Sequence, residues 1–126
     1  MAGQTPDLIK AYRAEAAVAA RRIVKHGAAD GGVVQAAAVG DAIMGVSTEI
    51  GSAIGETCDV MKSGLADVVY GGAVTRGDWL TSDANGKAVA AAPGAGTNNN
   101  VIGRAEVSGV LDDIGVVYIV PGRIQG

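Results

Sequence analysis

The sequence has no phenylalanine and only one cysteine and one histidine among its 126 residues. A single cysteine excludes an internal disulfide and is typical of a protein made in a reducing compartment. Cys58 and His26 are too few to form a zinc site, which takes several such ligands. A catalytic dyad would require these two residues to meet in space by coincidence. We therefore expect Cys58 to be a small core residue and His26 to lie at a strand end.

Other signals of catalysis, export and membrane insertion are also missing. No apolar run approaches the roughly 20 residues of a membrane span. The first ten residues lack the basic and apolar regions of a secretion signal, so we expect synthesis in a cytoplasm. Gly71-Gly72 and Gly94–Gly96 do not match phosphate-binding loops, and no spaced acidic calcium loop is present. The sequence therefore predicts no enzyme activity, no cofactor, no metal and no membrane contact.

Small residues dominate what is present. The 20 glycines are roughly twice the average usage of about 7%, and the apolar residues are mostly alanine and valine. These side chains predict a thin core, and a small body buries a lower fraction of its surface than a large one. We therefore expect neighbouring subunits to share in the stability of the chain.

Charge is divided unevenly along the chain. Residues 1–26 carry a net charge of +3, whereas residues 27–126 carry −6. An acidic body argues against nucleic acid as a partner, because nucleic-acid binders carry basic faces. The basic segment could contact an acidic protein surface, such as another copy of this chain, or it could simply be solvated.

Short apolar runs separated by turn residues predict a mainly β fold, a small β-barrel or β-sandwich. We expect residues 1–20 to form an N-terminal arm, extended or partly helical, and residues 21–126 to form a single β-rich domain. The expected strands cover about residues 21–26, 32–38, 42–48, 56–62, 65–70, 78–82, 87–92, 101–108 and 114–120.

Two parts of the sequence are similar to each other. Residues 22–46 match residues 79–103, and residues 55–60 match residues 115–120, with spacings that drift from 55 to 60. Each longer segment contains an apolar pair, Ile23-Val24 or Trp79-Leu80, followed by an Asp-Gly or Asn-Gly turn, the strongest short signal of a hairpin. These matches predict two duplicated halves. The alternative is chance similarity in a chain rich in glycine, alanine and valine.

One short stretch is similar to biotinyl and lipoyl carrier domains. Met61-Lys62, followed by residues 72–78, resembles the modified lysine at a hairpin tip and the Gly-Asp segment of those domains. That resemblance implies a carrier modified at Lys62. Ser63 stands where such carriers have a second methionine, and the Gly-Asp segment follows at a short distance.

A resemblance to bacteriophage head-decoration, or capsid-cement, proteins covers roughly residues 9–126. It implies a structural protein of the virion that binds the outer surface of an assembled head and reinforces it against the pressure of packaged DNA. The implied partners are the major capsid protein and further copies of the chain, with a trimer expected by analogy. A subunit of another phage assembly, such as the tail, is the alternative. The stretches that carry the resemblance are residues 22–38, 43–48, 55–93, 101–109 and 117–126.

We expect contacts with the capsid or with neighbouring subunits in the arm and on two later strands. Apolar arm residues could add a strand to a capsid sheet, with basic residues setting the register. Trp79 and the apolar run 116–120 could instead serve the core or self-association. The expected contact residues are Leu8, Ile9, Lys10, Tyr12, Arg13, Trp79, Val117 and Ile119.

Overall fold

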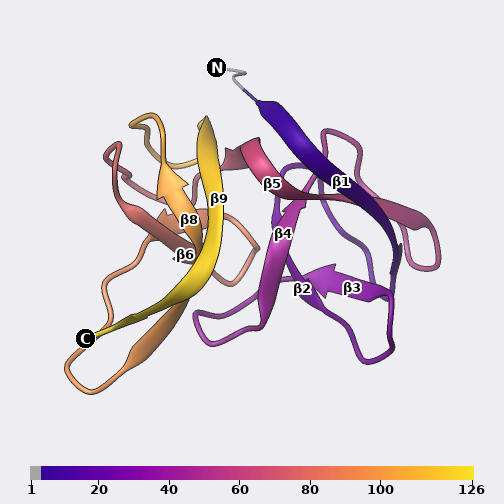
Figure 1. The fold of residues 1–126 in the computed structure, drawn as a ribbon, viewed down its shortest axis with the longest axis horizontal. Coiled ribbons are helices and arrows are strands. Elements are labelled where there is room, and N and C mark those ends of the chain that lie inside the picture. The colour runs from indigo at the N-terminus through magenta and orange to yellow at the C-terminus, as the bar shows by residue number, and fades with distance from the viewer. Residues whose placement is uncertain (1–3) are drawn as a thin grey trace.

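Nine strands make up the regular structure of the chain, in a computed structural model that describes residues 4–126 (Figure 1). None of the described residues forms a helix that could cross a membrane. The prediction of a mainly β fold is confirmed. The strands are β1 (Thr5–Ala14), β2 (Ile23–His26), β3 (Gly32–Gln35), β4 (Ile43–Ser47), β5 (Thr57–Val69), β6 (Trp79–Ser82), β7 (Ala88–Ala90), β8 (Asn98–Ala105) and β9 (Ile114–Gln125).

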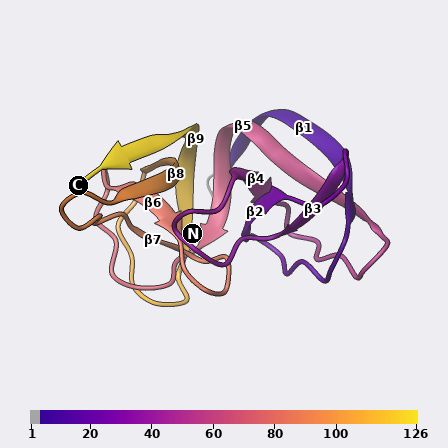
Figure 2. The same ribbon diagram turned by 90° about the horizontal axis from the view of Figure 1, so that it is seen from below.

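All nine strands belong to one sheet, in the order β1-β3-β2-β4-β5-β9-β8-β6-β7. Strand β1 also pairs with β5, so that β1, β3, β2, β4 and β5 close into a ring. Figures 1 and 2 both show two lobes side by side, with β1–β4 in one and β6–β9 in the other. The long strand β5 belongs to both lobes. We call them the first lobe and the second lobe.

The two lobes repeat each other in strand register. Val24 of β2 pairs with Gly45 of β4, and Leu80 of β6, its predicted counterpart, pairs with Gly103 of β8. The β2–β3 hairpin corresponds in the same way to the β6–β7 hairpin. The predicted duplication is therefore visible as a repeated pattern of hydrogen-bonded strands.

This repeat begins earlier in the chain than the sequence comparison indicated. Ala14 at the end of β1 forms a parallel pair with Val33, and Tyr70 forms a parallel bridge with Ala88. The C-terminal half of β5 is therefore the counterpart of β1, and it closes the second lobe as β1 closes the first.

The predicted match of residues 55–60 with residues 115–120 is wrong by three residues. Ser47 pairs with Val60, and Ala105, the counterpart of Ser47, pairs with Val117. Val60 therefore corresponds to Val117 rather than to Val120. Both segments begin with glycine and end with valine, so the shifted alignment still matched these two positions.

Residues 5–14, inside the predicted arm, are extended and lie in the sheet as β1. They run antiparallel to β5, with Ile9 opposite Met61 and Tyr12 opposite Cys58. A helix, which Asp7 could have capped, does not form there. Residues 1–3 lie outside the described part of the chain.

Corresponding positions fill the cores of the two lobes with different volumes. Ala14 and Cys58 are both buried in the first lobe, and their counterparts in the second are Tyr70 and Gly115. A Cβ atom on Gly115 would lie 2.0 Å from Cζ of Tyr70. The Tyr70 hydroxyl donates a hydrogen bond of 2.6 Å to the Val107 carbonyl. The large ring thus takes the space that two small side chains fill in the first lobe.

A row of apolar side chains on the outside of the first lobe joins it to the second. Ile23, Val46 and Met61 are neighbours across β2, β4 and β5, and all three are fully buried. They belong to the same apolar cluster as Leu80 and Ile102 of the second lobe. One apolar cluster therefore spans the junction of the lobes, while the interior of the first lobe is a second cluster.

Candidate functional site

The second lobe carries the corresponding row on its own outer side. Trp79 of β6 pairs with Arg104 of β8, and Arg104 pairs with Tyr118 of β9. They are the counterparts of Ile23, Val46 and Met61, but they are not covered. Arg104 is exposed, Tyr118 is 50% exposed and Trp79 is half-buried. We call these three residues the Trp79 row.

Arg104 packs against Trp79 within this row. Its guanidinium carbon lies 4.9 Å from the centroid of the Trp79 ring, and its Nε donates a hydrogen bond of 3.1 Å to the Gly77 carbonyl. Tryptophan, tyrosine and arginine are the residues that most often anchor protein interfaces. The row therefore suits contact with another protein. Of its three residues, the sequence had predicted only Trp79.

Val117 and Ile119, which were expected in the core or in self-association, lie in the core. Val117 is fully buried and Ile119 is 5% exposed, whereas Tyr118 and Val120 between and after them face outward. Side chains alternate between the two faces of a strand. Only one face of this apolar run is covered by the core, so Tyr118 rather than Val117 is exposed at the surface.

Two predicted contact residues of β1 do form an apolar surface. Leu8 is 53% exposed and Ile9 is 47% exposed. The ladder between β1 and β5 shifts register around Leu8, and Pro6 has no N–H to donate. Bulges and proline blunt an edge strand against further pairing. The exposed side chains, rather than strand addition, are therefore what this segment offers to a partner.

Lys10 of β1 and Lys62 of β5 both lie beside the ring of Tyr12. Tyr12 is half-buried, with the ammonium of Lys10 5.1 Å and that of Lys62 5.3 Å from its ring centroid. Lys62 also donates a hydrogen bond of 2.9 Å to the Tyr12 hydroxyl. Arg13 is exposed at the end of β1. Lys62 thus lies in the middle of a long strand and not at a hairpin tip, so the carrier interpretation is wrong.

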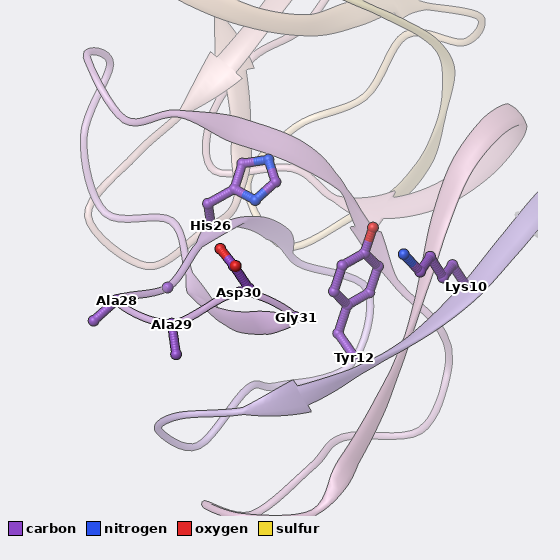
Figure 3. Close-up of a pocket in the computed structure, with 8 residues that line it drawn as sticks. Lys10, Tyr12, His26, Ala28, Ala29, Asp30 and Gly31 are labelled. Atoms are coloured by element: carbon purple, nitrogen blue, oxygen red, sulfur yellow. The ribbon is translucent and has the colours of Figure 1, made fainter.

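A cavity of about 420 Å³ opens beside this cluster. Figure 3 shows Lys10 and Tyr12 side by side on β1, with His26 and the β2–β3 turn facing them. The turn residues that line the cavity are 27–31. Lys10 and Asp30 are the two charged residues of the lining, so their charges balance.

Glu15 fixes the turn that borders the cavity. Its carboxylate accepts hydrogen bonds from the N–H groups of Ala28, at 2.7 Å, and Ala29, at 3.0 Å. These two bonds hold the pKa of Glu15 below its ordinary value of 4.5.

A pH titration of stability tests this role of Glu15. A carboxyl whose pKa is lowered on folding stabilises the fold above its unfolded pKa, and the contribution is lost as the pH falls. We expect the free energy of unfolding to fall more steeply between about pH 5 and pH 3 for the wild type than for Glu15→Gln. Urea unfolding across this range is the measurement. Parallel curves for the two proteins would contradict the role.

Cys58 and His26 have the places that the sequence predicted. Cys58 is buried in the first-lobe core, and burial raises the pKa of its thiol, which disfavours the reactive thiolate. His26 is exposed at the end of β2. Among residues 4–126, no group of three or more histidine, cysteine, aspartate or glutamate side chains is placed to hold a metal ion.

Two comparisons with known proteins give a match. A family model described as "Phage cement protein" matches residues 3–109. The crystal structure of the head fiber gp8.5 N base in bacteriophage phi29 is similar, with a TM-score of 0.65 over 94% of this chain and 98% of that chain. The two sequences are 19% identical, so this likeness concerns the fold alone. No curated protein matches the chain.

Proposed function

Because the chain belongs to the phage cement protein family, whose members are structural proteins of phage heads, we propose that it binds the outer surface of an assembled head and stabilises the shell. The family match over residues 3–109 is the observation that carries this proposal. The expected role as a non-enzymatic structural protein agrees with it.

The two-lobed body suits a protein that holds a shell together. The lobes share β5 and an apolar cluster at their junction, so surfaces on them are held at a fixed separation. A contact on each lobe could then link two neighbouring molecules of the particle. Because a shell offers many equivalent positions, individually weak contacts can add up to a strong clamp.

We assign different partners to the two surfaces. Leu8 and Ile9, flanked by the basic residues Lys10 and Arg13, would contact the major capsid protein. The Trp79 row would contact a neighbouring copy of the chain, giving an oligomer on the shell. Trimers are the oligomer that the sequence resemblance implied.

Sedimentation with purified phage heads and tails tests this function. We expect the protein to sediment with heads and not with tails. The Leu8→Asp/Ile9→Asp double variant should bind heads at least about tenfold more weakly, because two carboxylates would then be desolvated in the contact.

Ile50→Asp is the control, since Ile50 is apolar and 71% exposed but lies away from β1. Point variants are preferred to removal of β1, because β1 closes the first ring. Binding to tails instead of heads would favour the tail-subunit alternative. Equal head binding by the β1 variant and the wild type would show that β1 is not the contact.

A further inference from the structure

The turns that lead into β5 and β9 have the same structure in the two lobes. They comprise residues 53–56 in the first lobe and residues 110–113 in the second. The third residue of each turn, Gly55 or Asp112, has positive φ, of 84° and 68° respectively. Positive φ is unfavourable for a residue that carries a Cβ atom, yet Asp112 keeps the conformation that glycine adopts easily. The repeat of the strands therefore extends to these two turns.

A carboxylate closes each turn from within. Glu56 accepts a hydrogen bond of 2.7 Å from the Ala53 N–H, and Asp113 accepts one of 2.9 Å from the Val110 N–H. The N–H groups of Glu56 and Asp113 donate back to the carbonyls of Ala53 and Val110, both at 3.0 Å. These reciprocal bonds fix the shape of each turn, so the side chain between them is presented in a defined direction.

That side chain is large, apolar and exposed in both turns. Ile54 is 72% exposed and Leu111 is 59% exposed, and we call them the two tips. A single exposed apolar residue is ordinary on a protein surface. Ile50 is such a residue, because it is 71% exposed while its counterpart Val107 packs against the core. The tips differ from it, since both lobes expose an apolar side chain at the equivalent position of a fixed turn.

A partner that accepts both tips must offer two similar apolar pockets at the separation that the lobes fix. A second copy of this chain does not suit, because its own lobes differ. The outer row of the first lobe is buried, whereas that of the second is the exposed Trp79 row. A shell offers many equivalent positions, so two neighbouring copies of one shell protein can supply two identical pockets.

Charge near the tips indicates the rim of those pockets. Every charged residue within residues 48–56 and residues 106–113 is acidic. Cations also reach these segments from outside. Arg13 approaches the first segment, and Arg76 and Lys87 bind the second. The acidic residues outnumber these cations in both segments, so a basic rim would complement each tip.

We propose that Ile54 and Leu111 insert into equivalent apolar pockets, with basic rims, on two neighbouring copies of one protein of the head shell. The proposal rests on the proposed function and adds to it the residues that link the shell. Binding at one tip holds the other close to its own pocket, so the two contacts reinforce each other. A chain bound in this way resists the separation of the two shell proteins.

Head binding by tip variants tests the proposal. Ile54→Ser is compared with Ile50→Ser, which removes the same side chain at nearly the same exposure from the same loop. We expect Ile54→Ser and Leu111→Ser each to bind heads at least about tenfold more weakly than the wild type, the loss expected for one buried aliphatic side chain. Ile50→Ser should bind within about twofold of the wild type. The double tip variant should lose at least about 100-fold.

Binding by either tip variant that is as tight as binding by Ile50→Ser would overturn this inference and leave the proposed function standing. A double tip variant no weaker than the single variants would also overturn it. If the wild type itself fails to bind heads, both the inference and the proposed function are overturned. Thermal unfolding of each variant shows whether a loss of binding comes from loss of the fold.

Crosslinking tests whether the two tips meet the same protein. Ala53→Cys and Val110→Cys each place a thiol at an exposed position beside a tip, where a benzophenone maleimide can be attached. Cys58 is buried and should remain unlabelled. After irradiation on heads, we expect mass spectrometry to find both positions crosslinked to the same segment of one shell protein, beside lysine or arginine. Crosslinks to two different segments, to a segment without basic residues, or to another copy of this chain would overturn the proposal.

Discussion

Gly115→Cys is expected to lower the free energy of unfolding by about 3 kcal/mol or more, at the upper end of overpacking effects. The added Cβ would lie 2.0 Å from Cζ of Tyr70. That ring is fully buried and tied to the Val107 carbonyl, so it cannot move aside without losing packing and a hydrogen bond. Urea unfolding measures the loss. Gly72→Ala is the control, because a Cβ there meets nothing within 4 Å.

A double variant tests whether the core positions of Tyr70 and Gly115 in the second lobe correspond to those of Ala14 and Cys58 in the first. Tyr70→Ala alone should cost roughly 3–5 kcal/mol, the range for truncation of a large buried aromatic. Tyr70→Ala/Gly115→Cys recreates the alanine and cysteine that Ala14 and Cys58 supply in the first lobe. We expect the double variant to be more stable than the sum of the single effects by at least about 1 kcal/mol. Strict additivity would contradict the correspondence.

Trp79→Ala/Tyr118→Ala is expected to convert an oligomer into a monomer. Truncation of an aromatic anchor at an interface commonly costs about 2 kcal/mol or more, which is roughly a 30-fold loss of affinity. Both residues lie on the outer face of the second lobe, so the fold itself should change little. Sedimentation velocity of the wild type and the variant is the measurement.

Tyr118→Phe is the matched control for this variant, because it keeps the ring that Tyr118 presents beside Arg104. It should sediment like the wild type. A monomeric wild type, or a double variant that keeps the mass of the oligomer, would contradict the assignment of the Trp79 row to self-association.

Much of the fold could be predicted because its turns are local. Gly31 and Gly86 both adopt positive φ in the predicted hairpins. The Asp-Gly and Asn-Gly pairs in the sequence indicate such turns, because these residues tolerate positive φ. The role of β1 could not be predicted in this way. Its counterpart is half of a longer strand, and the closing pairs, Ala14 with Val33 and Tyr70 with Ala88, join residues far apart in sequence.

The site was predicted less completely, for two physical reasons. An all-apolar run such as residues 116–120 has no polar alternation to show which face is covered, so the sequence could not indicate that Val117 is buried and Tyr118 is exposed. The pairing of Arg104 with Trp79, and of Lys62 with Tyr12, depends on strand register across the sheet. Once the register is known, the repeat identifies both clusters as counterparts of buried apolar positions.

The central claim is that this chain lies on the outside of a phage head and clamps it. Cryo-electron microscopy of heads assembled with and without the protein tests that claim most directly. We predict that heads containing it show additional two-lobed density on the outer surface, with β1 turned toward the shell. Identical outer surfaces in the two maps, or additional density only inside the head or on the tail, would contradict it.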